Sequence, residues 1–484
     1  MGNYILAIVA VYLGVILFIS YLSGRKNSTN EAFFLANRST PWYIVAIGML
    51  GDSISGVTFV SVPGMVRDFD MTYMQLVFGF FVGYIVVAYV LLPLYYRLNL
   101  VSIYTYLEQR FGYCSYKTGA SFFILSKIVG AAAKLYLVIL ILQSLVFDQM
   151  GIPFTVTAVA VVFVIWVYTF RNGMGTIIWT DVLQTVSLLV ALGLIIWQVA
   201  SHINIGWADV METVRQSGHS RIFVFDDWHS RQNFFKQFLS GVFIVIVMTG
   251  LDQNMMQKNL TCRNLKEARK NMLTYGFGFI PMNFLFLTLG ILLLTFASRS
   301  GITLPAASDN ILPMLASKYL GTPVLLCFTV GVVAAAFSNA DSALTSLTTS
   351  FCVDILGMGH NVEKAKHTRT FVHSAICAVF ILVILFINGM QQTNVLNTIY
   401  VAVSYTYGPL LGLFSFGLFC NRSVKDRLVP YICILAPLLS YILEWGLKTA
   451  LNYQVGYEIL LFNGAVTFAG LWLIRTADYY KTLR

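Results

Sequence analysis

Apolar stretches of about 20 residues recur from one end of the chain to the other, with short polar segments between them. A helix of that length crosses a hydrocarbon core about 30 Å thick. The pattern therefore predicts about 13 membrane-spanning helices. The predicted spans are 4–23, 41–66, 73–96, 118–147, 152–170, 177–200, 236–257, 271–297, 322–349, 370–388, 394–420, 428–447 and 455–474.

The chain carries too few charges to cover a soluble fold. Of its 484 residues, 58% are hydrophobic and 11% are charged, whereas soluble domains contain about 25% charged residues. The first apolar span, Tyr4 to Ser23, has neither a basic segment before it nor a small-residue cleavage site, so we expect a retained helix. No basic arm accompanies the net charge of +10, which argues against nucleic-acid binding.

Positive charges divide unevenly between alternate loops. One set, which includes Arg25, Arg110, Lys258 and Arg422, holds about 21 Lys and Arg residues, and the other set holds about 8. Because cytoplasmic loops carry the excess, we predict an outside N-terminus and a cytoplasmic C-terminus. All Asn-x-Ser/Thr sequons fall in the predicted cytoplasmic loops, which favours a bacterial inner membrane over a glycosylating compartment.

Polar residues interrupt the second predicted span. The segment from Gly51 to Gly56 places two Gly, two Ser and Asp52 at bilayer depth. Helix breakers and hydroxyls at that depth are tolerated where the backbone lines a cavity or packs within protein. A broken helix frees carbonyl groups that can coordinate a cation. The alternative is a small-residue face for helix packing.

The ninth predicted span is the second one that we expect to be interrupted. Ser338, Asp341, Ser342 and Thr345 lie at i, i+3, i+4 and i+7, so they share one helical face. A carboxylate among hydroxyls offers hard oxygen ligands that suit an alkali cation. An intramembrane carboxylate also marks a functional site by default. The alternative is a packing face on which Asp341 bonds a neighbouring helix.

Further ionisable residues lie in other spans. Asp181 is near the cytoplasmic end of the sixth span, and Asp252 is near the end of the seventh. Asp181 either belongs to a functional site or only compensates nearby charges. Lys127 and Lys134 share one face of the fourth span. Lys127 is close enough to the helix end to extend toward it. Lys134 is deeper and needs a partner, which is the solute, water, or a carboxylate such as Asp252 or Asp341.

Four segments of the chain resemble the sodium/solute symporter family, whose members carry glucose, proline, sialic acid, iodide and monocarboxylates. Trp179 to Gln184 matches the family's WTDVLQ motif, and the others resemble family motifs in the same order along the chain. The other segments are Phe33 to Trp42, Tyr104 to Gly112 and Asp252 to Ala268. The resemblance extends from about residue 30 to residue 420.

This resemblance implies an all-α polytopic fold of the LeuT type, with two inverted five-helix repeats and an unwound first core helix. The whole chain, residues 1–484, would form a single transmembrane transporter domain. The repeats would cover approximately 41–200 and 236–420. The flanking helices would be 4–23, 428–447 and 455–474.

The resemblance also implies where cations bind. In the family, sodium lies between the first helix of one repeat and the third helix of the other. The matching ligands here are the carbonyls of Gly51, Ile54 and Ala335 and the side chains of Ser338 and Asn339. Some members hold a second cation, for which the matching residues are Asp181, Asp341 and Ser342. Asn339 and Asp341 depart from the hydroxyls that are usual in the family.

The solute candidates are Ser55, Thr58, Tyr73, Lys134 and Asp252. Ser55 and Thr58 match hydroxyls that a sialic acid carrier uses near the solute carboxylate, and Lys134 lies on the helix where that carrier has an Arg. These matches favour an acidic sugar or another small carboxylate as the solute.

The sequence thus predicts a sodium-coupled secondary symporter that imports a small polar organic solute, a sugar, a sialic acid or another small carboxylate, by alternating access. Sodium is the coupling ion, and we expect no other cofactor and no obligate protein partner. The alternatives are a proton-coupled carrier of the same fold, in which Asp341 or Asp181 takes the proton, and a membrane sensor derived from it. The chain has no HExxH, GxSxG or phosphate-binding glycine motif, so we do not expect an enzyme.

Overall fold

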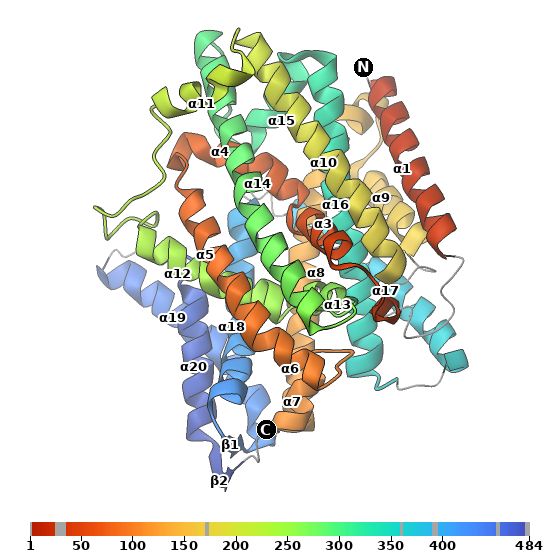
Figure 1. The fold of residues 1–484 in the computed structure, drawn as a ribbon, viewed down its shortest axis with the longest axis vertical. Coiled ribbons are helices and arrows are strands. Elements are labelled where there is room, and N and C mark those ends of the chain that lie inside the picture. Colours follow the sequence, from red (N-terminus) through yellow and green to blue (C-terminus); the bar gives the residue numbers. More distant parts are fainter. Residues whose placement is uncertain are drawn as a thin grey trace.

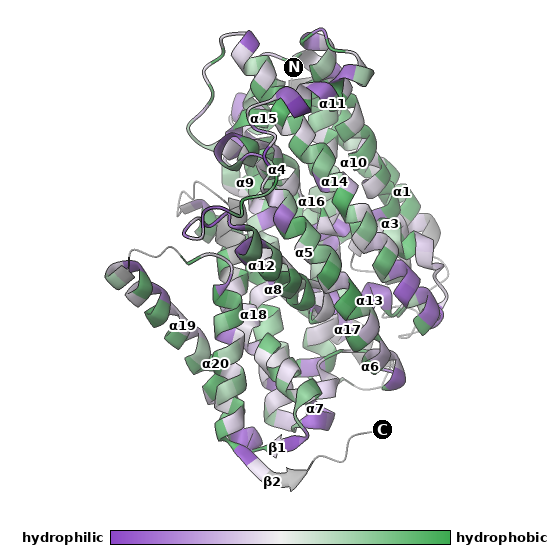
Figure 2. Cartoon of the chain, turned by 60° about the vertical axis from the view of Figure 1, so that its left-hand side comes forward, coloured by the Kyte–Doolittle hydropathy of each residue, from purple (hydrophilic) through white to green (hydrophobic). Residues whose placement is uncertain are grey.

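The computed structural model describes residues 2–24, 35–169, 174–358, 362–389, 395–451 and 455–479. Within these residues the chain is helical apart from short turns, loops and one two-stranded antiparallel sheet, and the helices form an elongated bundle (Figure 1). Hydrophobic residues predominate along the helices, and many hydrophilic residues lie near the two ends of the bundle (Figure 2). This distribution is the one that a lipid environment requires.

The helices of the first predicted repeat are α3 (Trp42–Ser53), α4 (Gly56–Phe69), α5 (Tyr73–Val86), α6 (Leu92–Arg97), α7 (Thr105–Arg110), α8 (Tyr113–Leu142), α9 (Phe154–Thr169) and α10 (Met174–His202). Those of the second are α12 (Phe234–Val245), α13 (Gln253–Asn259), α14 (Leu265–Arg299), α15 (Ile311–Lys318), α16 (Gly321–Ser350), α17 (Val362–Gly389) and α18 (Val395–Phe419). The remaining α-helices and strands are α1 (Gly2–Gly24), α11 (Trp207–Gln216), α19 (Val429–Leu451), α20 (Ile459–Leu473), β1 (Arg422–Val424) and β2 (Arg475–Tyr479).

Each predicted span overlaps a helix or a bent pair of helices. Within the described residues, seven helices are long and apolar enough to cross a membrane, or up to nine if each of two bent pairs forms one span. Three shorter apolar helices lie in α1, α9 and α20. The number of 13 crossings stays a prediction.

The predicted break in the second span is present. Helices α3 and α4 meet at an angle of 62°, and Ile54 and Ser55 between them have extended backbone conformations. Ser55 caps the new helix by accepting a hydrogen bond from the Thr58 amide. A Cβ atom on Gly51 would lie 2.0 Å from Thr185 Oγ1 of α10, so glycine allows α3 to approach α10 closely at the break.

The second break lies in the seventh predicted span, so the expectation that the ninth span is interrupted was wrong. The π-helix η5 (Ile246–Gly250), which continues α12, meets α13 at 70°. Asp252 caps α13 by accepting hydrogen bonds from the amides of Asn254, at 2.8 Å, and Met255, at 3.3 Å. The first helix of each predicted repeat is therefore the broken one.

Helix α16 stays continuous across its polar segment because it contains neither Gly nor Pro between Ala334 and Ser350. The hydroxyls of Thr348 and Thr349 donate to carbonyls one turn earlier, at 2.7 and 2.9 Å, so they have partners within the helix. Polar side chains alone therefore do not break a helix that lacks a backbone breaker.

We expect Gly51→Ala to lower the free energy of unfolding by about 1–3 kcal/mol, because the new methyl group overlaps Thr185. Thermal unfolding of the purified protein in sodium-free detergent measures this effect. Gly193→Ala in α10 is the matched control, because no atom lies within 4 Å of its Cβ position. Equal stability of the two variants would show that α3 and α10 do not pack this closely.

Candidate functional site

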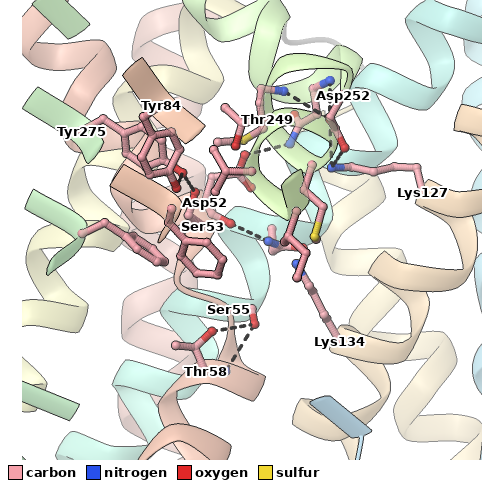
Figure 3. Close-up of a pocket in the computed structure, with 18 residues that line it drawn as sticks. Asp52, Ser53, Ser55, Thr58, Tyr84, Lys127, Lys134, Thr249, Asp252 and Tyr275 are labelled. Carbon is pink, nitrogen blue, oxygen red and sulfur yellow. Dashed lines mark hydrogen bonds and ion pairs between the residues drawn. The ribbon is translucent and has the colours of Figure 1, made fainter. Parts of the chain in front are cut away.

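A cavity of about 100 Å³ lies between the two helix breaks (Figure 3). Its wall includes residues of α3, α4, α5, α8, α14 and α16, together with the break between η5 and α13. Both broken helices therefore contribute to one cavity, as expected when irregular backbone within a membrane lines a cavity.

A buried ion cluster lies beside this cavity. The Nζ atom of Lys258, on α13, is 2.6 Å from Asp181 Oδ2 on α10 and 2.9 Å from Asp52 Oδ2 on α3. All three side chains are at most 1% exposed. Assigning Lys258 to a cytoplasmic loop was therefore wrong, because the short helix after the second break carries it into the bundle. One ammonium group links three helices here.

The sodium ligands implied by the family resemblance fall on two segments that are in contact. Gly51 and Ile54 are buried at the first break, and Ala335, Ser338 and Asn339 are buried on α16. The Asn339 amide donates to the main-chain oxygen of Asp52 at 2.5 Å. These residues are thus brought together, and their binding of sodium stays a prediction.

Of the second predicted cation set, Asp341 and Ser342 lie on α16 and Asp181 lies on α10. Ser338 Oγ donates to Asp181 Oδ1 at 2.6 Å, and Asp341 Oδ2 accepts from the Tyr168 hydroxyl at 3.1 Å. Asp341 Oδ1, Ser342 Oγ and Thr345 Oγ1 are buried and have no hydrogen-bond partner within the described part of the chain. Such a set of uncompensated hard oxygen atoms is suited to an alkali cation.

The two lysines of α8 have different environments. Lys127 forms an ion pair with Asp252 at 3.0 Å and does not extend to the helix end, contrary to expectation. Tyr407 donates to the same carboxylate at 2.8 Å. Lys134 lines the cavity and forms no ion pair with any described residue. The alternative in which Lys134 pairs with Asp252 or Asp341 was therefore wrong.

Ser55 and Thr58 line the cavity on the α4 side, where their hydroxyls are 3.3 Å apart. Tyr73 is buried at the start of α5 and is not among the residues that line the cavity. The sequence analysis did not identify the aromatic part of the wall, which consists of Phe80, Tyr84, Tyr275 and Phe279.

The sequence analysis also did not assign roles to Asp52 and Lys258. The signal for Asp52 was its position at bilayer depth beside two glycines. The signal for Lys258 was the segment from Gly250 to Asp252, a glycine followed by a helix-capping residue, which places the next residues in a new helix.

Comparisons with known proteins identify the family of the chain. The family model for the sodium:solute symporter family matches residues 33–426. The sodium/sialic acid symporter NanT of Aliivibrio fischeri is 24% identical, over 88% of this chain and 85% of that protein. The human sodium/iodide cotransporter is also 24% identical, over 85% of this chain and 65% of that protein.

Two solved structures have a similar fold. One is a substrate-bound, outward-open state of a Na⁺-coupled sialic acid symporter, with a TM-score of 0.82 and 20% identity over 98% of this chain and 97% of that chain. The other is the nucleobase-cation-symport-1 family transporter Mhp1 in a closed conformation, with a TM-score of 0.59 and 15% identity over 92% and 93%. These likenesses confirm the LeuT-like helical fold.

We expect Lys258→Met to destabilise the protein by about 3–5 kcal/mol, because two buried carboxylates lose their shared partner. Adding Asp52→Asn and Asp181→Asn should restore part of that loss. Lys266→Met is the control on an exposed surface nearby and should stay within about 0.5 kcal/mol of the wild type. Unfolding in sodium-free detergent tests this, and equal effects of the Lys258 and Lys266 variants would contradict the ion cluster.

Proposed function

Because the chain belongs to the sodium:solute symporter family, we propose that it imports a small carboxylate together with sodium by alternating access. Family membership makes it an integral multi-pass membrane protein and a sodium-coupled solute symporter. Its transported partners are accordingly a small molecule and the sodium ion. The family and the relatives are transporters, which confirms that the chain is not an enzyme.

The observation that carries the carboxylate proposal is the ammonium group of Lys134. It faces the cavity without a carboxylate partner among the described residues, whereas Lys127 on the same helix has one (Figure 3). An intramembrane lysine costs about 2.5–3.5 kcal/mol on insertion scales unless it finds a partner. A solute carboxylate would supply that partner, and the hydroxyls of Ser55 and Thr58 lie in the same cavity to bond it.

For the coupling ion, we propose sodium at Gly51, Ile54, Ala335, Ser338 and Asn339, with a second cation at Asp181, Asp341 and Ser342. Support comes from the contact between the first break and α16, and from the unpaired oxygens of Asp341 and Ser342. Asp181 of the second site accepts a hydrogen bond from Ser338 of the first site. A cation bound at one site would therefore alter cation binding at the other.

We also propose an outside N-terminus and a cytoplasmic C-terminus in a bacterial inner membrane. The excess of Lys and Arg in one set of loops persists after Lys258 is removed from it. The start of α1 and strand β2 lie at opposite ends of the bundle, as this orientation needs (Figure 1).

Lys134→Gln should abolish the preference for carboxylates. We expect sodium-driven uptake of a carboxylate to fall about tenfold or more, because a hydrogen bond to a charged group contributes about 1.5–3 kcal/mol. The assay compares lactate, benzoate and N-acetylneuraminate with their amides in proteoliposomes, and Lys134→Arg is the charge-retaining control. Equal losses for the carboxylate and its amide would instead make Lys134 a structural residue.

A further inference from the structure

A second cavity lies at the edge of the bundle, where α1 packs against the core (Figure 1). Its volume is about 160 Å³, and its described lining residues are all Ala, Val, Leu, Ile or Phe. The wall includes Val9 of α1, Val161 of α9, Val146 of the π-helix η3 (Gln143–Phe147) and Phe337 of α16. We call this cavity the α1–α9 pocket.

The mouth of the α1–α9 pocket is continuous with the surface that faces lipid. Among the lining residues, Leu6 is 39% exposed, and Ala10 and Ala160 are also exposed. Beside this rim, Val159 and Phe163 of α9 are 43% and 58% exposed. In an integral membrane protein such apolar side chains face the hydrocarbon core. The pocket therefore opens toward acyl chains.

The chemistry of the wall determines what can fill the pocket. Water is excluded, because no lining side chain among the described residues can donate or accept a hydrogen bond. An apolar cavity of about 150 Å³ in another protein stays dry and binds an apolar molecule. Unfilled space would also forfeit dispersion contacts along the wall. A lipid acyl chain is the apolar body that the bilayer supplies at this mouth, and the wall offers no charge to a headgroup.

The floor of the pocket is connected to the candidate cation residues. Phe337 is 2% exposed and directly precedes Ser338, whose hydroxyl donates to Asp181 at 2.6 Å. The ring of Phe337 stacks on that of Tyr168, with centroids 6.4 Å apart and planes 13° apart. The Tyr168 hydroxyl in turn donates to Asp341 at 3.1 Å. A chain that packs on Phe337 therefore supports the ring that orients Asp341.

We propose that the α1–α9 pocket binds one acyl chain of a bilayer phospholipid, and that this chain strengthens cation binding at Asp341 by packing on Phe337. The acyl-chain site rests on the pocket alone. Its effect on the cation rests on the second cation site proposed above. The headgroup stays outside the pocket, so the site recognises the chain and not the headgroup.

Photo-crosslinking in lipid nanodiscs tests the acyl-chain site. The probe is a phosphatidylcholine with a diazirine in one acyl chain, and mass spectrometry locates its adducts. We expect adducts on Leu142 and Val146, which line the pocket and are 5% and 2% exposed. Val161→Phe fills the pocket and should remove these adducts. Val159→Phe is the matched control on the exposed side of α9 and should keep them.

Three results would overturn the site. One is labelling of exposed α9 residues in the wild type without labelling of Leu142 and Val146, because lipid would then surround the helices without entering. Another is adducts from a diazirine fatty acid but none from the phospholipid, which would make the occupant a free acid. The third is persistence of the buried adducts in Val161→Phe. Ala160→Leu, which narrows the mouth, serves as a second variant if Val161→Phe does not fold.

The effect on the cation is tested by sodium titrations of thermal unfolding, because a bound ion raises the midpoint. Delipidated protein in detergent is compared with the same protein after addition of dioleoylphosphatidylcholine. In the wild type and Val159→Phe, lipid should lower the sodium concentration for half-maximal stabilisation about fivefold, as is typical of coupled sites. Val161→Phe and Asp341→Asn should show no such dependence on lipid.

The two measurements separate the possible failures. An equal lipid response in Val159→Phe and Val161→Phe would contradict the coupling, even where the adducts establish the acyl-chain site. If sodium stabilises the wild type in neither condition, both the coupling and the proposed sodium symport are wrong, whereas the adducts still decide whether a chain enters the pocket.

Discussion

The ammonium group of Lys258 occupies a fully buried position between the carboxylates of Asp52 and Asp181. These residues come from the two broken helices and from α10, so the interaction fixes both breaks relative to the same point. Without its partners each of these charges would be too costly to bury within the bundle. The cluster therefore constrains how the first helices of the two predicted repeats can be arranged, and the cavity and the candidate cation face follow from that arrangement.

The breaks also determine which polar groups remain available. Backbone groups freed at the first break face α16, where Asn339 bonds the Asp52 carbonyl. On the cavity side, Lys127 and Tyr407 both bind the carboxylate of Asp252, the residue that caps α13 after the second break. Among the described residues that line the cavity, Lys134 is then the charged side chain without a counter-ion. Lys127 and Asp252 thus stabilise the fold by pairing with each other, whereas the ammonium group of Lys134 stays available to bind a solute.

The sequence predicted much of this arrangement. Glycine and serine at bilayer depth located the first break, and four short motifs indicated the family. Each of these signals lies within a short stretch of sequence. The second break was placed in the wrong span because polarity was taken as a sign of interruption, whereas α16 lacks a backbone breaker. The pairing of Lys127 and Lys258 and the aromatic part of the cavity wall depend on contacts between distant segments, which periodicity within one helix does not reveal.

Sodium-driven accumulation is the most direct test of the central claim. The measurement is uptake of radiolabelled benzoate into proteoliposomes with an inward sodium gradient and equal pH on both sides. The account predicts accumulation above the outside concentration, which disappears when the gradient is dissipated and is reduced in Ser338→Ala. Accumulation in sodium-free buffer under a proton gradient alone, beyond that of protein-free liposomes, would contradict sodium coupling and favour a proton-coupled carrier of the same fold.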